Sequence, residues 1–113
     1  MRMFIGLAMF EGASHAALDD EATVRAALER GVVAGSFTLY DLRVVRFSPQ
    51  GVTAAAIVGE SHLTLHSWPE EGRLFVDVAS CSNEASVRDA IDAIAASFEG
   101  ARLTEISLRS MGA

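Results

Sequence analysis

Apolar and polar residues follow a two-residue spacing through much of the chain. Leu63 and Leu65 alternate with polar neighbours, and similar alternation, or a run of β-branched and aromatic residues, recurs in five other segments. These patterns predict six strands, at residues 3–10, 36–47, 52–58, 62–67, 74–80 and 103–108. A turn sequence with Pro49 second and Gly51 fourth separates the second and third strands, which predicts an antiparallel hairpin.

Two segments between these strands have helical spacing instead. Residues 19–21, two aspartates and a glutamate, suit the N-terminus of a first helix, which we expect to end at Gly31. A second helix follows residues 82–83, and we expect Gly100 to end it. Its apolar face consists of Val87, Ala90, Ile91, Ile94, Ala95 and Phe98. The element order predicts an α+β fold, a two-layer α/β sandwich with two helices on one face of a mostly antiparallel sheet.

Length and composition indicate one domain that pairs with a copy of itself. The 113 residues suffice for a single core and are too few for a second. Half of the residues are hydrophobic, and the strands are apolar on both sides of the pleat. We therefore expect the sheet face without helices to pack against the same face of a second chain, giving a homodimer.

Charge and hydropathy exclude several classes of partner. The net charge is −6 and all nine basic residues are Arg, with no cluster of them to neutralise phosphates, so we expect no nucleic acid partner. No apolar run approaches the roughly 20 residues that span a bilayer, and residues 1–10 lack the features of a signal peptide. We expect a cytoplasmic protein with no membrane partner that acts on a small molecule, and the acidic surface mildly favours a cationic one.

The chemistry that the sequence suggests centres on Ser61, which follows Glu60 and precedes His66 by five residues. A serine hydroxyl can attack the preceding carbonyl and exchange the amide for an ester. A base such as His66 then removes the serine α-proton, and elimination leaves a pyruvoyl group after ammonia is lost. Ser61 and His66 have opposite parity in a strand, so this mechanism predicts a bend or bulge between them.

The sole cysteine, Cys81, cannot form an internal disulfide and is either a buried thiol or a reactive one. A thiol stays mostly protonated at neutral pH and is a competent acid toward a carbanion. Residue types alone leave other readings open. Ser61 and His66 also suit a surface or capping pair, and His62, His66, Asp77 and Cys81 together suit a zinc ion, although their spacing matches no standard zinc pattern.

The segment of residues 59–70, GESHLTLHSWPE, together with FSPQG at residues 47–51 and Cys81, resembles the bacterial S-adenosylmethionine decarboxylase proenzymes. The resemblance implies a single decarboxylase domain over residues 1–113 that cleaves itself into 1–60 and 61–113. It implies that Glu60 ends the first fragment and that Ser61 becomes the pyruvoyl cofactor. His66 is then the acid/base of processing and Cys81 the proton donor in decarboxylation.

The same resemblance implies how the substrate binds. Phe47 and Trp68 line the nucleoside pocket, with Phe47 stacking on adenine, and Glu70 accepts hydrogen bonds from the ribose hydroxyls. Family members are dimers whose sites lie near the subunit boundary. The implied activity is decarboxylation of S-adenosylmethionine for polyamine (spermidine) biosynthesis.

Several positions depart from the common family pattern. The first strand has neither the usual His nor the usual acidic residue, and Val45, Glu71 and Ser82 replace a His, an aromatic residue and a Gly. Arg73 stands where Tyr is frequent, and its guanidinium suits a substrate carboxylate. An alternative is therefore the same pyruvoyl chemistry on L-ornithine or L-arginine. A further alternative is an unprocessed, non-catalytic homologue that binds a ligand or a metal.

Overall fold

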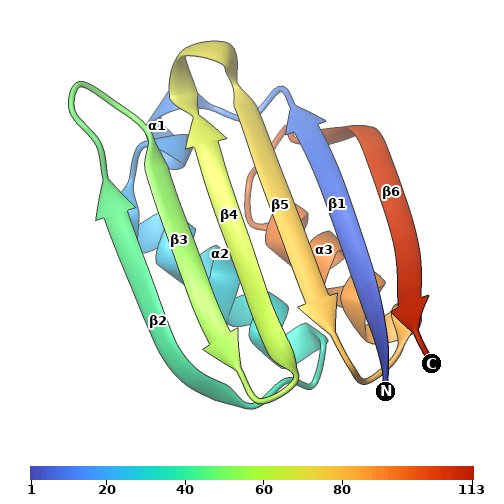
Figure 1. The fold of residues 1–113 in the computed structure, drawn as a ribbon. Helices are drawn as coiled ribbons and strands as arrows, with labels where there is room; N and C mark the ends of the chain where they lie inside the picture. The colour runs from blue at the N-terminus through green and yellow to red at the C-terminus, as the bar shows by residue number, and fades with distance from the viewer.

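One sheet of six strands forms the front layer of the computed structural model, which describes residues 1–113 (Figure 1). Its spatial order is β2-β3-β4-β5-β1-β6, and every neighbouring pair is antiparallel. The strands are β1 (Arg2–Glu11), β2 (Leu39–Arg46), β3 (Val52–Val58), β4 (Ser61–Trp68), β5 (Arg73–Ser80) and β6 (Arg102–Gly112). The predicted sheet is thus confirmed, with β1 inserted between β5 and β6.

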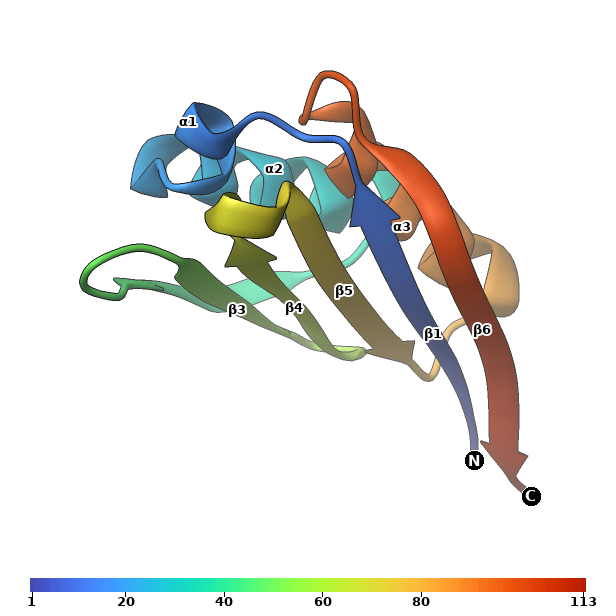
Figure 2. The ribbon, with the colours of Figure 1, turned by 90° about the horizontal axis from the view of Figure 1, so that it is seen from above.

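Both long helices cover the same face of this sheet (Figure 2). They are α2 (Glu21–Ala34) and α3 (Glu84–Ala96), and the shorter elements are α1 (His15–Leu18) and the 3₁₀ turn η1 (Pro69–Glu71). Asp20 and Asn83 cap the long helices through side-chain oxygens that accept hydrogen bonds from backbone N–H groups. The predicted two-layer α+β fold is therefore the observed one.

The core lies between the helices and alternate residues of the strands. Its large members are fully buried, and each contributes about 1.5–3 kcal/mol through loss of contact with water. They include Leu18, Val24, Leu28, Leu63, Leu65, Leu74, Val76, Val78, Ile91 and Ile94. Because residues 63 and 65 point inward, residues 62, 64, 66 and 68 of β4 point to the other face.

Two helix ends differ from the prediction. Gly31 does not end α2, which continues to Ala34; Gly31 is instead buried where α2 crosses α3, and a Cβ there would lie 2.7 Å from Ile94. Helix α3 ends at Ala96, before Gly100, and the chain then turns so that Phe98 still reaches the core. Close packing, rather than helix termination, requires the first of these glycines.

The opposite face of the sheet has no covering layer within the chain. Apolar side chains lie open on it, including Val45, Ile57 and Leu7, which are 52%, 57% and 38% exposed. We refer to this surface as the open face. No helix of the molecule has the length and apolar character needed to cross a membrane.

Candidate active site

The backbone at Ser61 is strained. Gly59 and Glu60 form a two-residue turn between β3 and β4, and Val58 pairs with Ser61 across it. Ser61 has a φ of 150°, in a region of backbone conformation that residues other than glycine rarely adopt. Such a conformation costs on the order of 1–3 kcal/mol and persists only where its surroundings enforce it. The strain lies at the peptide bond that the sequence marks for cleavage.

Hydrogen bonds hold both the backbone carbonyl and the side-chain carboxylate of Glu60 in place. Its carbonyl oxygen accepts a hydrogen bond from the backbone N–H of Cys81 at 3.1 Å. Its carboxylate accepts one from the backbone N–H of Thr38 at 3.0 Å and a longer one, 3.4 Å, from the Thr38 hydroxyl. These anchors leave the carbonyl polarised by a donor and unable to rotate away. Thr38, which residue types did not single out, is therefore part of the site.

Cys81 reaches this position because β4 begins at the end of the sheet where its antiparallel neighbour β5 ends. Ser61 pairs with Ser80, the last residue of β5, so the next residue lies beside the turn. The Ser80 hydroxyl is bonded to that of Ser82 at 2.6 Å and accepts the Ser82 N–H, which shapes the loop. Cys81 is a free cysteine and partly exposed. Glu60, Ser61, His62 and Cys81 together are called the Ser61 cluster below.

His62 joins the Ser61 cluster from the open face. Its Nδ1 lies 3.2 Å from Ser61 Oγ, and its Nε2 lies 3.7 Å from Asp77 Oδ2. Asp77 also accepts a hydrogen bond from the Thr64 hydroxyl. Burial raises the pKa of the Asp77 carboxyl, and the neighbouring His62 only partly offsets this.

His66 lies in a second group of side chains at the far end of β4, with Phe47 and Trp68. The His66 ring is 4.3 Å from that of Trp68, edge to face, and 6.2 Å from that of Phe47. Its Nδ1 is hydrogen-bonded to the Thr53 hydroxyl, directly opposite on β3. Phe47, Thr53, His66 and Trp68 are called the His66 cluster below. Thr53 was not predicted, although counting back through a two-residue turn at Gly59 places it opposite His66.

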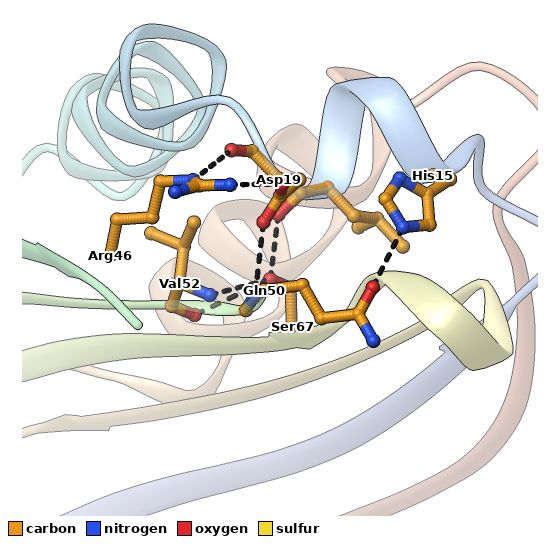
Figure 3. A network of polar contacts seen from close by, with 8 residues as sticks. His15, Asp19, Arg46, Gln50, Val52 and Ser67 are labelled. Carbon is orange, nitrogen blue, oxygen red and sulfur yellow. Dashed lines mark hydrogen bonds and ion pairs between the residues drawn. The ribbon is translucent and has the colours of Figure 1, made fainter. Parts of the chain in front are cut away.

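The loop that carries Phe47 is fixed by Asp19 (Figure 3). The Asp19 carboxylate accepts hydrogen bonds from Arg46 Nη2 at 2.6 Å and from the Gly51 N–H at 2.9 Å. The Gly51 carbonyl in turn accepts the Phe47 N–H at 2.7 Å. The hydrogen bond from Arg46, and then that from Gly51, lower the pKa of Asp19.

Ser67 ties the same loop to the core from below (Figure 3). Its buried hydroxyl donates to the Leu18 carbonyl at 2.7 Å and accepts the Val52 N–H at 3.1 Å. At the outer edge, His15 Nε2 is hydrogen-bonded to the Gln50 side chain at 2.8 Å. The short helix α1, absent from the predicted elements, thus supports the loop that holds Phe47.

Glu70 and Arg73 stand at the same end of the sheet. Glu70 lies in η1 and is exposed. Arg73 Nη2 contacts Glu11 Oε1 at 2.6 Å, and its Nη1 lies 3.5 Å from Glu71 Oε1. The hydrogen bond with Glu11 raises the pKa of Arg73. The guanidinium that the sequence offered to a substrate carboxylate is therefore already paired with two carboxylates of its own chain.

The structure does not bring Ser61 and His66 together within one chain. Strand β4 pairs with β3 and β5 without a register shift, so the expected bend or bulge between them is absent. Five residues of regular strand separate their Cα atoms by roughly 16 Å. Nor do three or more of the candidate metal ligands, His, Cys, Asp and Glu, cluster anywhere. His62, His66, Asp77 and Cys81 therefore do not form a zinc-ligand group within one chain.

Comparisons with known proteins agree with this architecture. The family model for S-adenosylmethionine decarboxylase matches residues 7–110. A proenzyme of that name from Methanococcus aeolicus is 38% identical over 93 residues, 82% of this chain and 80% of the relative. One from Prochlorococcus marinus is 41% identical over 78 residues, 69% of this chain and 62% of the relative. The crystal structure of the adenosylmethionine decarboxylase from Aquifex aeolicus VF5 superimposes with a TM-score of 0.82, at 26% identity, covering 96% of this chain and 88% of that one.

Fold and site define a small two-layer α+β domain with a strained serine beside a free cysteine. The chain belongs to the S-adenosylmethionine decarboxylase proenzyme family.

Proposed function

We propose that the chain is a self-processing, pyruvoyl-dependent decarboxylase of S-adenosylmethionine that supplies decarboxylated S-adenosylmethionine for spermidine biosynthesis. Family membership supports the activity. The observation that carries the processing is the backbone of the turn: Ser61 is strained, and the Glu60 carbonyl accepts a hydrogen bond from Cys81. These are the residues that cleavage between Glu60 and Ser61 requires.

Cleavage begins when Ser61 Oγ attacks the Glu60 carbonyl carbon. The carbonyl oxygen becomes an oxyanion, and the Cys81 N–H already points at it. When this intermediate collapses, an ester replaces the peptide bond between Glu60 and Ser61. The ester rotates more freely and relieves the backbone strain at Ser61, so the strain raises the free energy of the uncleaved chain and favours the forward step. Removal of the Ser61 α-proton then expels the Glu60 carboxylate and with it residues 1–60. The dehydroalanine left at position 61 tautomerises to an imine, water adds and ammonia leaves, so that residues 61–113 begin with the pyruvoyl group.

A pyruvoyl group at position 61 would supply an electron-accepting carbonyl, which can condense with the substrate amine with loss of water and then take up the electron pair left when the carboxylate departs as carbon dioxide. The residues around Ser61 fit its formation in place, since both anchors of Glu60 are present, the Thr38 N–H on its carboxylate and the Cys81 N–H on its carbonyl. Cys81 delivers the proton that replaces the carboxylate. It is suited to this because it directly follows the partner of Ser61 in the β4–β5 ladder.

The His66 cluster suits recognition of the nucleoside. Phe47 and Trp68 present aromatic surfaces on either side of His66, and Phe47 is 45% exposed and available for stacking on adenine. Glu70 extends from η1 beside them to accept hydrogen bonds from the ribose hydroxyls. The charge of Arg73 is matched by Glu11 and Glu71, so no observation at this position favours ornithine or arginine over S-adenosylmethionine.

A homodimer completes the site. The Ser61 cluster and the His66 cluster lie at opposite ends of β4, roughly 16 Å apart, and both border the open face. A two-fold axis that lies between two such faces, parallel to the sheets and perpendicular to β4, sets the Ser61 end of one chain over the His66 end of the other. The same packing covers Val45, Ile57 and Leu7. His66 of the partner subunit then removes the α-proton from the ester at Ser61.

The test is the intact mass of the purified protein. Wild type should separate into two fragments, the second with a blocked N-terminus, whereas Ser61→Ala should remain one full-length chain. Ser110→Ala, at an exposed position in β6, is the matched control and should cleave normally. A Ser61→Ala chain that still splits at this bond contradicts the assignment, and an uncut wild type supports the non-catalytic alternative.

Substrate choice needs a separate measurement. Carbon dioxide release from cleaved wild type should be at least about 100-fold faster with S-adenosylmethionine than with ornithine or arginine at equal concentration, because a site built for hydroxyl and base contacts penalises substrates that lack them. Faster release from either basic amino acid would reassign the substrate and leave the pyruvoyl chemistry intact.

A further inference from the structure

The Ser61 hydroxyl has a basic neighbour in its own chain. His62 Nδ1 lies 3.2 Å from Ser61 Oγ, within hydrogen-bonding distance. On the other side of the ring, His62 Nε2 lies 3.7 Å from Asp77 Oδ2, and Asp77 Oδ1 is held by the Thr64 hydroxyl. The contacts form a continuous series along the open face that ends at the hydroxyl which starts cleavage.

The register of β4 and β5 places these side chains together. Thr64 pairs with Asp77 and His62 pairs with Ala79, so Asp77 is the diagonal neighbour of His62 on the same face. On the other side, His62 pairs with Ile57 of β3. Neither Ile57 nor Ala79 titrates, which leaves Asp77 as the charged group beside the imidazole.

The arrangement selects one tautomer of His62. A carboxylate near Nε2 favours the form with its hydrogen on Nε2, which leaves the lone pair of Nδ1 facing Ser61 Oγ. A nucleophile next to a base that a third group orients is the general arrangement by which hydroxyls are activated. Asp77 is well held for this task because its second oxygen is bonded to Thr64.

We propose that His62 is the base that accepts the Ser61 hydroxyl proton in the first step of self-cleavage, and that Asp77 is the positioning residue that orients it. The inference rests on the proposed cleavage between Glu60 and Ser61. It assigns to His62 a step that precedes the α-proton removal proposed for His66.

The step is balanced without any added reactant. The Oγ–H bond breaks as the proton moves to His62 Nδ1, and a bond forms between Ser61 Oγ and the Glu60 carbonyl carbon, whose oxygen takes the negative charge. When the C–N bond breaks, the Ser61 nitrogen takes the proton back from His62 and the carbonyl is restored. The product is the ester of Glu60 and the free amine of Ser61.

Two histidines thus serve two chemically different steps. The ester has no hydroxyl proton left, so His62 has completed its task when the ester forms. His66 of the same chain lies roughly 16 Å away along the strand, too far to reach Ser61. In the proposed dimer, His66 of the partner subunit removes the α-proton. Loss of His62 should therefore stop the chain as an amide, and loss of His66 should stop it as an ester.

Hydroxylamine separates these outcomes, because at neutral pH it cleaves an ester and leaves a peptide amide intact. The experiment follows freshly refolded full-length chain by intact mass, with and without hydroxylamine. In His62→Gln, formation of hydroxylamine-sensitive plus cleaved chain should be at least about tenfold slower than in wild type. His66→Ala should accumulate hydroxylamine-sensitive chain. Glu29→Gln, at an exposed position of α2 outside both clusters, is the control and should behave as wild type.

Two further variants separate chemistry from folding. His62→Ala should regain part of its rate when imidazole is added, which a structural defect would not allow. Asp77→Asn should slow the first step, yet it should leave the melting temperature unchanged or higher, because the ionised carboxyl is partly buried and its charge opposes folding at neutral pH. In the His62→Gln background, Asp77→Asn should have no further effect on the rate.

The results that would overturn the inference are specific. A His62→Gln chain that forms ester less than about tenfold more slowly than wild type removes His62 as the base, since general bases contribute about 100-fold or more. An Asp77→Asn substitution that slows the first step equally in both backgrounds shows that Asp77 does not act through His62. A wild-type chain that resists both spontaneous and hydroxylamine cleavage overturns the proposed function instead.

Discussion

Cys81 contributes two different groups to the Ser61 cluster. Its backbone N–H donates to the Glu60 carbonyl at 3.1 Å, and its side chain is a free thiol. The first group belongs to every residue except proline, whereas the second is specific to cysteine. In the proposed function, cleavage and decarboxylation therefore depend on different atoms of the same residue.

Replacement of Cys81 by alanine should separate these two roles. Because the N–H remains, Cys81→Ala should cleave within a few-fold of the wild-type rate. Without the thiol, carbon dioxide release per pyruvoyl group should fall by at least about 100-fold. The fraction of cleaved chain, measured by intact mass over time, checks the first expectation. The rate of carbon dioxide release, divided by the amount of pyruvoyl group that a carbonyl reagent traps, checks the second. Normal turnover in this variant would remove the proton-donor role, and failure to cleave would show that the thiol is needed earlier.

The sequence suffices to find single residues of the site but not their contacts. Glu60, Ser61 and Cys81 were predicted as a group, and the structure places them around one peptide bond. The parity argument that Ser61 and His66 point to opposite sides was sound, but the bend invoked to reconcile them does not exist. Contacts made across strands, such as that of Thr38 with Glu60, require a register that residue types do not supply.

The loop between β2 and β3 shows how one element positions a binding residue. Its backbone makes few hydrogen bonds with the sheet. The Asp19 carboxylate holds the loop instead, by accepting hydrogen bonds from the Gly51 N–H and from Arg46. The Phe47 N–H then closes the loop onto the Gly51 carbonyl. The position of Phe47, the stacking residue of the proposed function, depends in this way on Asp19, outside the His66 cluster.

Asp19→Asn should weaken this loop in a pH-dependent way. The pKa of Asp19 is lowered in the folded chain, so its stabilising contribution is present above its ordinary value near 4 and is lost as pH falls through the folded value. The melting temperature of Asp19→Asn should be below that of wild type at pH 7, and the difference should shrink below about pH 4. Thermal unfolding monitored across that range checks it.

The control for this experiment is Asp89→Asn, at an exposed position on α3. It should show no such convergence with wild type. Because the loop holds Phe47, Asp19→Asn should also raise KM for S-adenosylmethionine while leaving the fraction cleaved unchanged. A difference in melting temperature that persists unchanged at pH 2–3 would contradict the role of the charged carboxylate.

Elements were predictable where burial follows a simple period, and their ends were not. All six strands and both long helices were found from spacing or from runs of β-branched and aromatic residues, and the central strands β3, β4 and β5 do bury alternate residues against the helices. Gly31 was wrongly predicted to end the helix, because the sequence does not distinguish a glycine required for close packing, here against Ile94, from a glycine that ends a helix. Helix α1 was missed because four residues are too few to show a period.

At the scale of the whole molecule, the open face links stability to function. One chain leaves Val45, Ile57 and Leu7 in water and separates its Ser61 cluster from its His66 cluster by the length of β4. The homodimer proposed above would remove both deficits through one isologous, face-to-face contact, since each chain would offer its His66 end to the Ser61 end of the other. The fold and the family followed from the sequence, but the proposal that two chains share the site rests on the straight course of β4, which the sequence did not predict.

Mixed dimers test that division directly. Neither Ser61→Ala nor His66→Ala should complete cleavage alone, since the first lacks the nucleophile and the second lacks the group that removes the α-proton. When the two chains are coexpressed, a mixed dimer pairs the intact Ser61 of one chain with the intact His66 of the other at one of its two sites. The His66→Ala chain should then be cleaved in the mixture, at up to half of the sites in mixed dimers, and its fragments can be identified by a tag of distinct mass. If His66 acted within its own chain, no mixture would restore cleavage, and the two clusters would have to meet by a rearrangement of β4 rather than by assembly.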